Sequence, residues 1–380
     1  MFNERNLRQF GERDNLQREI KKQIEYPRFM SYGLVEKWGD EIPRYAEADP
    51  DAPEWRATPV KPLDFSQEGY GKVYVKDESD RTSNPTGTIK DRAAWELATL
   101  YRDYARALYL KIHRAQTLTK GELEKIPIPY LSVITAGNEG LALAECFKKY
   151  DLPPPKLVID FNIKQSILEE LLKLRVNIYA TDLSLRLSGS EICRIADNVD
   201  GIDITSSRAI DPASVFYDWH VHEVFNEEPD EIYLPYGSGR LMENYLFWQA
   251  RSMRNDAAGV PDPRLKADVA KVISINILGA EPARLDSKAD KATAKFKPFL
   301  LFQDRDIKSM VNLAFTGKNT IKQPLNEDRV IEAYESLTAR GVEAEPTAAL
   351  GLGLYFERFS QGLVPESKKV FIINTGKGLI

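Results

Sequence analysis

The chain has 380 residues, of which 43% are hydrophobic, and its 52 basic and 57 acidic residues give a formal net charge of −5. This size and apolar share predict one or two domains with a real core. The interspersed charges and negative balance argue against a nucleic-acid partner. No apolar stretch approaches the ~20 residues of a membrane helix, and the polar start is not typical of a secretory signal, so we expect a cytoplasmic protein with no membrane partner.

Residues 1–55 read as a polar, partly helical extension. After it, the spacing of apolar residues alternates between a period of two and a period of 3.6. This alternation predicts strands at 72–76, 131–134, 156–160 and 176–180, and helices at 93–110, 141–150 and 166–174.

A second series of the same kind follows, with strands predicted at 231–234, 272–278 and 369–373 and helices at 328–339 and 347–359. Strands and helices that alternate with short connections favour parallel βαβ units. We therefore expect two open parallel-sheet α/β domains, residues 56–205 and 206–380. Ligands of such sheets bind beyond the carboxyl ends of the strands.

The cysteines and histidines do not indicate a metal site. Cys146 and Cys193 stand in apolar runs, where buried thiols are expected rather than a disulfide or metal ligands. Besides His113, the chain has only His220 and His222, which would share one side of an extended segment. No further Cys or His nearby completes a zinc site, so no metal is expected.

The segment NPTGTIKDRAA, residues 84–94, places Lys90 between a turn and a helical run. Pro85 and Gly87 favour a tight turn, and Thr88 adds a hydroxyl. An unprotonated lysine amine can form an imine with an aldehyde cofactor. A lysine at a helix start is otherwise a solvated surface residue, so the lysine alone does not indicate this chemistry.

Burial near another positive charge favours the unprotonated amine of a lysine. Lys76 and Arg92 are the candidates for such a charge near Lys90.

The segment TAGNEG, residues 135–140, follows a predicted strand and precedes a predicted helix. The free N–H groups of a helix start can hold a carboxylate, and small residues let an amino-acid substrate approach the backbone. A plain capping turn explains the same residues equally well.

Two further turns follow predicted strands. The segment GSGRL, residues 237–241, can expose several N–H groups and the positive end of a helix dipole to a phosphate. The segment NTGKG, residues 374–378, follows the last strand. Alone, each is a common kind of turn.

Together and in this order, the four segments resemble the pyridoxal-phosphate enzymes of fold type II, the tryptophan synthase β-like superfamily, and threonine synthase-like proteins most closely. The resemblance covers residues 55–380 approximately, and segments 277–283 and 345–350 also fit it. It implies a cleft between the two α/β domains that holds pyridoxal 5'-phosphate, and a homodimer that acts on a small amino acid.

The resemblance also implies roles for single residues. Lys90 would form the Schiff base, Asn138 would bond the phenolic oxygen of the cofactor, and Thr375 would face its pyridine nitrogen. The phosphate would lie against Gly237, Ser238, Gly239, Arg240 and Leu241. The substrate would contact Thr88, Thr135, Ala136, Gly137 and Asn138.

A neutral hydroxyl at Thr375 does not keep the pyridine nitrogen protonated, which favours elimination or replacement at the β or γ carbon over transamination. The expected activity is that of a threonine synthase-like lyase. The alternatives are cysteine synthase-like β-replacement, dehydration of serine or threonine, and an inactive relative with a binding or regulatory role. Arg240 replaces a small residue of the family and Lys377 a histidine, and the longer segments 79–83 and 117–129 would reshape the substrate entrance.

Overall fold

The computed structural model describes a defined set of residues and places them in two compact units. The described residues are 57–115, 118–123, 125, 130–135, 137–174, 176–182, 201–203, 217–237, 239–260, 262–292 and 322–378. One unit comprises those within Ala93–Pro212, the other those within Ala48–Arg92 and Ala213–Leu379. The extension 1–55, the expected boundary near residue 205, Ala136, Cys193 and Ser238 lie outside the described residues.

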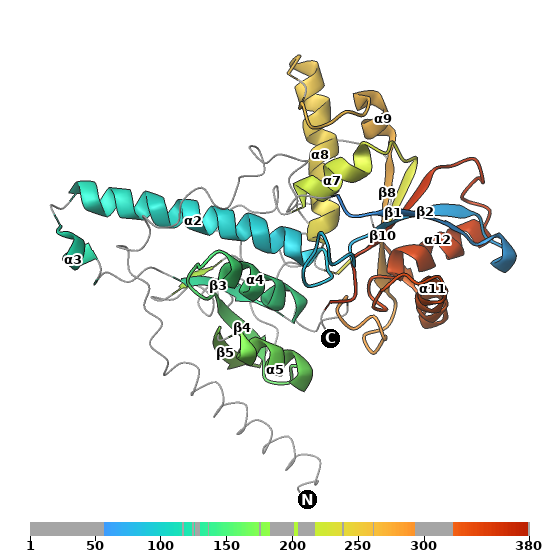
Figure 1. Ribbon diagram of the computed structural model, residues 1–380. Coiled ribbons are helices and arrows are strands. Elements are labelled where there is room, and N and C mark those ends of the chain that lie inside the picture. Colours follow the sequence, from blue (N-terminus) through green and yellow to red (C-terminus); the bar gives the residue numbers. More distant parts are fainter. Residues whose placement is uncertain are drawn as a thin grey trace, which may run out of the picture. The chain divides into compact units, whose positions relative to one another are not determined.

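The unit that contains the described C-terminal residues is built on a six-stranded sheet (Figure 1). Its strands, in spatial order, are β1 (Val60–Asp64), β2 (Lys72–Asp77), β10 (Val370–Asn374), β7 (Glu231–Pro235), β8 (Asn276–Pro282) and β9 (Lys322–Leu325). Strand β1 pairs with β2 antiparallel, and every other neighbouring pair is parallel.

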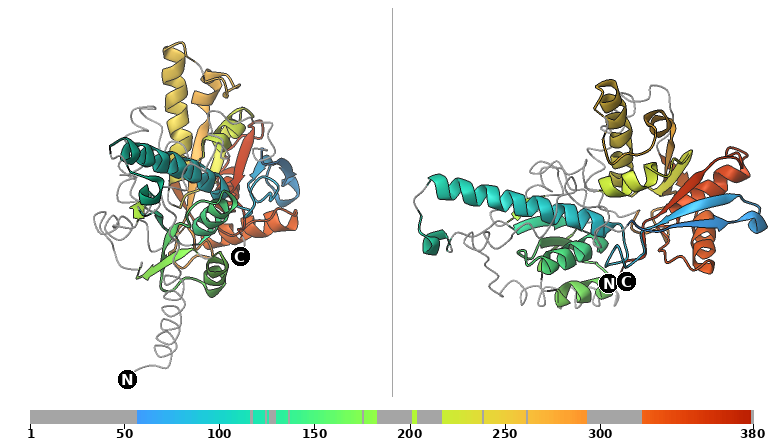
Figure 2. Two further views of the ribbon diagram at one scale, coloured as in Figure 1. Left: turned by 60° about the vertical axis from the view of Figure 1, so that its left-hand side comes forward. Right: turned by 45° about the horizontal axis from the view of Figure 1, so that its top comes forward.

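Helices cover both faces of this sheet (Figures 1 and 2). One face carries α11 (Glu327–Ala339) and α12 (Leu350–Ser360), and the other carries α7 (Asp218–Phe225), α8 (Arg240–Ala257) and α9 (Val269–Ser274). A short 3-10 helix, η3 (Ser66–Glu68), lies between β1 and β2. The central strands β7 and β10 are buried at all five positions, as expected for parallel strands covered on both sides.

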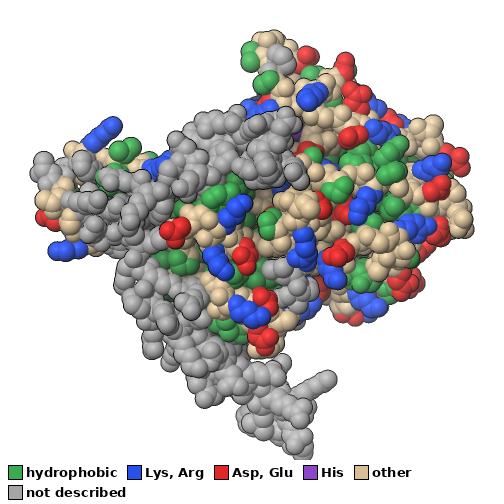
Figure 3. Space-filling model, in the orientation of Figure 1, with side chains coloured by type: hydrophobic (Ala, Val, Ile, Leu, Met, Phe, Trp, Pro, Cys, Tyr) green, Lys and Arg blue, Asp and Glu red, His purple; other side chains and the backbone are tan. Residues whose placement is uncertain are grey.

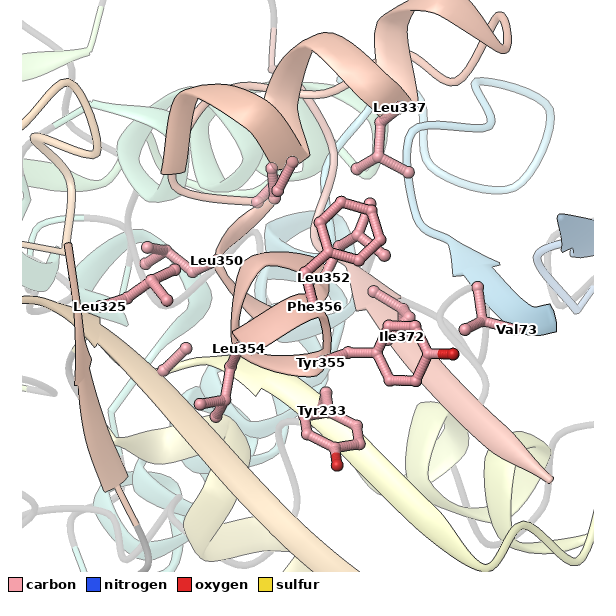
Figure 4. Close-up of a cluster of buried hydrophobic side chains, with 14 of the residues drawn as sticks. Val73, Tyr233, Leu325, Leu337, Leu350, Leu352, Leu354, Tyr355, Phe356 and Ile372 are labelled. Atoms are coloured by element: carbon pink, nitrogen blue, oxygen red, sulfur yellow. The ribbon is translucent and has the colours of Figure 1, made fainter. Parts of the chain in front are cut away.

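The core of this unit gathers where α12 packs on the sheet (Figure 4). Leu350, Leu354 and Phe356 of α12 contribute to it together with Ile372 of β10, and all four are fully or almost fully buried. Each buried side chain of this kind contributes about 1.5–3 kcal/mol relative to an exposed one. Gly351 allows the close approach, because a Cβ there would lie 2.6 Å from the carbonyl oxygen of Tyr233 on β7.

The other unit holds a four-stranded parallel sheet, with the spatial order β5 (Asn177–Thr181), β4 (Lys156–Asp160), β3 (Tyr130–Ile134) and β6 (Gly201–Asp203). Its helices are α2 (Lys90–Ala115), α3 (Lys120–Leu123), α4 (Asn138–Lys149) and α5 (Gln165–Lys173). The first three residues of α2 fall in the range of the six-stranded unit. Both described units therefore have the α/β architecture with parallel strands that the sequence predicts.

Most predicted elements are confirmed within a few residues, with two differences. Residues 272–278 were expected to form one strand, yet α9 continues to Ser274 and β8 begins at Asn276. The side chain of Asp268 accepts a hydrogen bond of 2.7 Å from the N–H of Ala270 and starts this helix, which overrides the strand preference of Val and Ile. The predicted helix at 347 begins at Leu350, after a turn.

The position of the first strands also differs from the expectation. Residues 60–92 were assigned to the N-terminal domain, but β2 pairs with β10, and the contacts group Ala48–Arg92 with Ala213–Leu379. The alternating pattern of a strand predicts which of its faces is buried, but it does not predict which strand it pairs with. Lys90 therefore lies in the same unit as the GSG and NTGKG turns.

The surface and the polar clusters agree with a chain of mixed charge. On the face that Figure 3 shows, acidic and basic side chains are interspersed.

Within the described ranges, no helix is both long and apolar enough to cross a membrane. His220 and His222 lie on α7 rather than on an extended segment, and the described residues contain no group of three or more His, Cys, Asp and Glu suited to a metal ion.

Candidate cofactor and substrate site

Three of the four candidate segments leave the same edge of the six-stranded sheet. Strands β2, β10 and β7 are parallel neighbours, so their carboxyl ends lie at one edge. The loop with Lys90 follows β2, the NTGKG turn follows β10, and the GSG turn follows β7. Open parallel sheets bind their ligands at this edge.

The loop that carries Lys90 and the NTGKG turn are in direct backbone contact. The N–H of Ile89 donates to the carbonyl of Thr375 at 3.1 Å, and the N–H groups of Lys377 and Gly378 donate to the carbonyl of Gly87 at 3.1 and 3.2 Å. Each turn therefore fixes the position of the other.

Gly376 is required for this contact. It adopts a φ of +96°, and a Cβ on it would lie 2.2 Å from the carbonyl oxygen of Gly87 and 2.9 Å from the Cα of Thr88. Only glycine combines this backbone conformation with so close an approach.

Polar side chains hold the lysine loop from within. The amide of Asn84 donates to the backbone carbonyl and the carboxylate of Glu78 at 2.9 and 2.8 Å. The carboxylate of Asp91 accepts from the N–H and the hydroxyl of Thr86 at 3.0 and 2.7 Å. Burial raises the pKa of Asp91 to about 6. The hydroxyl of Thr88, expected to contact the substrate, accepts from the N–H of Lys90 at 3.4 Å and is buried.

Lys90 is the first residue of α2, and its amine faces a tyrosine. Its Nζ donates to the hydroxyl of Tyr217 at 3.2 Å, and Tyr217 is 3% exposed at the N-cap of α7. The Nζ lies 5.9 Å from the ring centroid, so the hydroxyl is the closer contact. Sequence reasoning missed Tyr217, since it lies 127 residues from Lys90 and in none of the four segments.

Arg92, two residues after Lys90 in the sequence, belongs to a buried cluster of ion pairs. The guanidinium of Arg92 pairs with Glu78 at 2.7 Å and with Glu223 on α7 at 2.8 Å, and the amine of Lys76 pairs with Glu223 at 2.5 Å. Burial alone would raise the pKa of Glu78, but the charge of Arg92 holds it well below the usual value.

The cluster corrects one expectation. Lys76 and Arg92 were the candidates for a positive charge that acts on Lys90. The carboxylates of Glu78 and Glu223 balance both cations, so the pair presents no excess positive charge to Lys90. The ion pairs had no local sequence signal, because Glu223 is distant in the sequence from its two partners.

The GSG turn has the backbone of a helix start. Gly239 is the N-cap of the 18-residue helix α8 and adopts a left-handed φ of +85°. A Cβ on Gly237 would meet Lys291 and Ala292 at 3.6 Å, an ordinary contact, so the protein itself does not require glycine there. The side chains of Arg240 and Leu241 are buried, so Arg240 does not extend into solvent.

The fourth segment belongs to the other unit and forms a capped turn before α4. The hydroxyl of Thr135 accepts from the N–H groups of Gly137 and Gly140, each at 3.1 Å. Gly137 has a φ of +146°, and a Cβ there would lie 2.8 Å from Ile167. Asn138 is the half-buried first residue of α4.

No protein-family model and no curated protein matches the chain. Among solved structures, it is similar to a fungal L-serine ammonia-lyase from Rhizomucor miehei, with a TM-score of 0.55, 15% identity, and coverage of 85% of this chain and 94% of that one. It is also similar to an O-ureido-L-serine synthase, with a TM-score of 0.54, 16% identity, and coverage of 85% and 89%. A serine racemase from Dictyostelium discoideum matches with a TM-score of 0.51, 16% identity, and coverage of 92% and 99%. Identities this low concern the fold alone, and the chain has the two-domain α/β fold of the fold type II pyridoxal-phosphate enzymes.

Proposed function

We propose that the protein binds pyridoxal 5'-phosphate and acts on a small amino acid by β/γ-elimination or replacement, with threonine synthase-like lyase chemistry as the first assignment. The observation that carries this proposal is the contact between the Lys90 loop and the NTGKG turn at the carboxyl edge of the sheet. One fold hosts many activities, so it is the residues of this site, rather than the fold, that indicate the chemistry.

The residues at this edge fit the three polar parts of the cofactor. Lys90 supplies the amine for its aldehyde. Gly237, Gly239, Arg240 and Leu241 would supply backbone N–H groups at the start of an 18-residue helix, where the helix dipole favours a phosphate. Thr375, half-buried directly after β10, would supply a neutral hydroxyl for the pyridine nitrogen.

The bound cofactor would supply an electron sink for the α carbon of the substrate. Lys90 would hold and move the proton of that carbon. Thr375 carries no charge, so it would leave the ring nitrogen unprotonated and favour loss of a β or γ group over transamination.

The TAGNEG turn would hold the substrate. Thr135 already accepts from the N–H groups of Gly137 and Gly140, so its hydroxyl is occupied in shaping the turn. We assign Asn138 to the cofactor's phenolic oxygen and to the substrate, and we assign Thr135, Ala136 and Gly137 to the turn against which the substrate carboxylate would lie. Thr88 would contact the substrate from the lysine loop.

There are three alternatives, two of them enzymatic and one without catalysis. Cysteine synthase-like replacement and serine or threonine dehydration use the same residues, and the neighbours include an ammonia-lyase and a synthase. An inactive relative with a binding or regulatory role is suggested by Arg240 and Lys377, which replace a small residue and a histidine of the family. A cytoplasmic homodimer is part of the proposal.

The test is to load the purified protein with pyridoxal 5'-phosphate, reduce it with borohydride and map the modified peptide. We expect the reduced group on Lys90, and the exposed Lys377→Ala variant should keep it. A group on another lysine, or none, would refute the assignment. Substrate screens for released phosphate, ammonia or sulfide then separate the lyase, dehydratase and replacement activities.

A further inference from the structure

We propose that Tyr217 is the residue that positions the amine of Lys90 for its reaction with an aldehyde. This inference rests on the proposed function, since it concerns the lysine to which the cofactor would attach. Tyr217 lies in none of the sequence segments that indicate the site.

The contact between the two side chains is specific to the hydroxyl. Its oxygen lies 3.2 Å from the Nζ of Lys90, while the ring centroid is 5.9 Å away. A cation over the face of the ring would be attracted by the π system, but the nearer partner here is the oxygen. Tyr217 is 3% exposed, so water does not readily replace its hydroxyl.

Helix α7, which follows Tyr217, is tied to Arg92, which lies two residues after Lys90 in the same unit. Glu223 of α7 accepts from both terminal nitrogens of Arg92 at 2.8 and 3.0 Å. The same carboxylate pairs with the buried amine of Lys76 on β2 at 2.5 Å. The bidentate geometry fixes orientation as well as distance.

A second bond ties α7 to the lysine loop. The Nδ1 of His220 lies 2.8 Å from the carboxylate of Glu78, and its Nε2 lies 2.8 Å from the hydroxyl of Tyr245 on α8. Glu78 also pairs with Arg92 and accepts from Asn84 of the loop. These five groups are buried or nearly so, and such buried networks hold a site in a single geometry.

Imine formation requires a defined orientation of the Lys90 amine. The nitrogen of Lys90 forms a C=N bond with the aldehyde carbon, and the aldehyde oxygen leaves as water with the two hydrogens of the neutral amine. The nitrogen lone pair must face the carbon for this to happen. A hydroxyl that engages one N–H of the amine restricts the directions in which the lone pair points.

The experiment compares attachment with binding in Tyr217→Phe, which removes only the hydroxyl. The rate at which pyridoxal 5'-phosphate attaches to Lys90 is followed by absorbance. The affinity for pyridoxine 5'-phosphate, which has no aldehyde, is measured separately by titration. Tyr70→Phe is the matched control, since it also removes a hydrogen-bonded hydroxyl, but at the opposite end of β2.

We expect Tyr217→Phe to attach the cofactor roughly five- to tenfold more slowly. A change of this size corresponds to the loss of one hydrogen bond from the transition state of attachment. Its affinity for pyridoxine 5'-phosphate should match the wild type, and Tyr70→Phe should match it in both measurements. A wild-type attachment rate in Tyr217→Phe overturns the inference, and so does an equal loss of rate and affinity. A wild type that attaches no cofactor at Lys90 overturns the proposed function, and this inference with it.

Discussion

Replacing Gly376 by alanine tests the contact on which the candidate site depends. The left-handed backbone, with a φ of +96°, costs an L-residue about 1–2 kcal/mol. The new Cβ would also lie 2.2 Å from the carbonyl oxygen of Gly87, and overpacking of this kind adds about 1–3 kcal/mol. Because that neighbour is backbone, the turn must move away from the lysine loop.

The matched control is Gly341→Ala. Gly341 has a φ of +71°, and a Cβ there would meet nothing within 4 Å, so the control carries the backbone strain without the collision. We expect urea unfolding to show a loss for Gly376→Ala that exceeds that of Gly341→Ala by about 1–3 kcal/mol. Only Gly376→Ala should lose cofactor uptake. Equal losses in the two variants would mean that the turn and the loop are not in contact.

Three further predictions concern charge and the helix start. Burial raises the pKa of Asp218 to about 7, so between pH 4 and 7 the folded state holds a proton that the unfolded state releases, and the free energy of unfolding should fall as pH rises. For Asp218→Asn, the free energy of unfolding measured by urea titration should fall less across this pH range than it does for the wild type. A pH dependence equal to that of the wild type would contradict this role of Asp218. Glu223→Gln leaves Lys76 and Arg92 without one buried carboxylate, so its free energy of unfolding in urea should be about 3–5 kcal/mol lower than that of the wild type, whereas a variant that breaks the exposed ion pair of Lys173 should lose far less. Similar losses in the two variants would speak against a buried cluster. Gly239→Asp should weaken cofactor binding through strain and like charge, while Gly259→Asp, at a φ of +67° with open space, should not. Unchanged cofactor affinity in a folded Gly239→Asp protein would place the phosphate elsewhere.

The parts of the site that follow from the sequence are those that local residues determine. Pro85, Gly87 and Asn84 shape the lysine turn within a few residues, and Gly239 and Gly376 occupy left-handed positions at helix and strand ends. Turns and left-handed glycines of this kind are determined by neighbouring residues, so they could be predicted from the sequence without a structure.

The parts that did not follow depend on partners far apart in the sequence. Nothing near Tyr217 indicates that its hydroxyl meets Lys90, and nothing near Glu223 indicates that it pairs with Arg92 and Lys76. The pairing of β2 with β10 has the same origin, since an alternating strand fits several sheets equally well.

The central place of β10 also affects how the unit can form during synthesis. This strand lies between β2 and β7, yet it is the last described strand that a ribosome would make. Until it emerges, the facing edges of β2 and β7 lack their partner and are open to pairing with other chains. The cofactor edge cannot be complete before that moment, so a nascent chain arrested before residue 370 should have exposed strand edges and no competent lysine loop. Contacts this distant also predict slow folding for the unit.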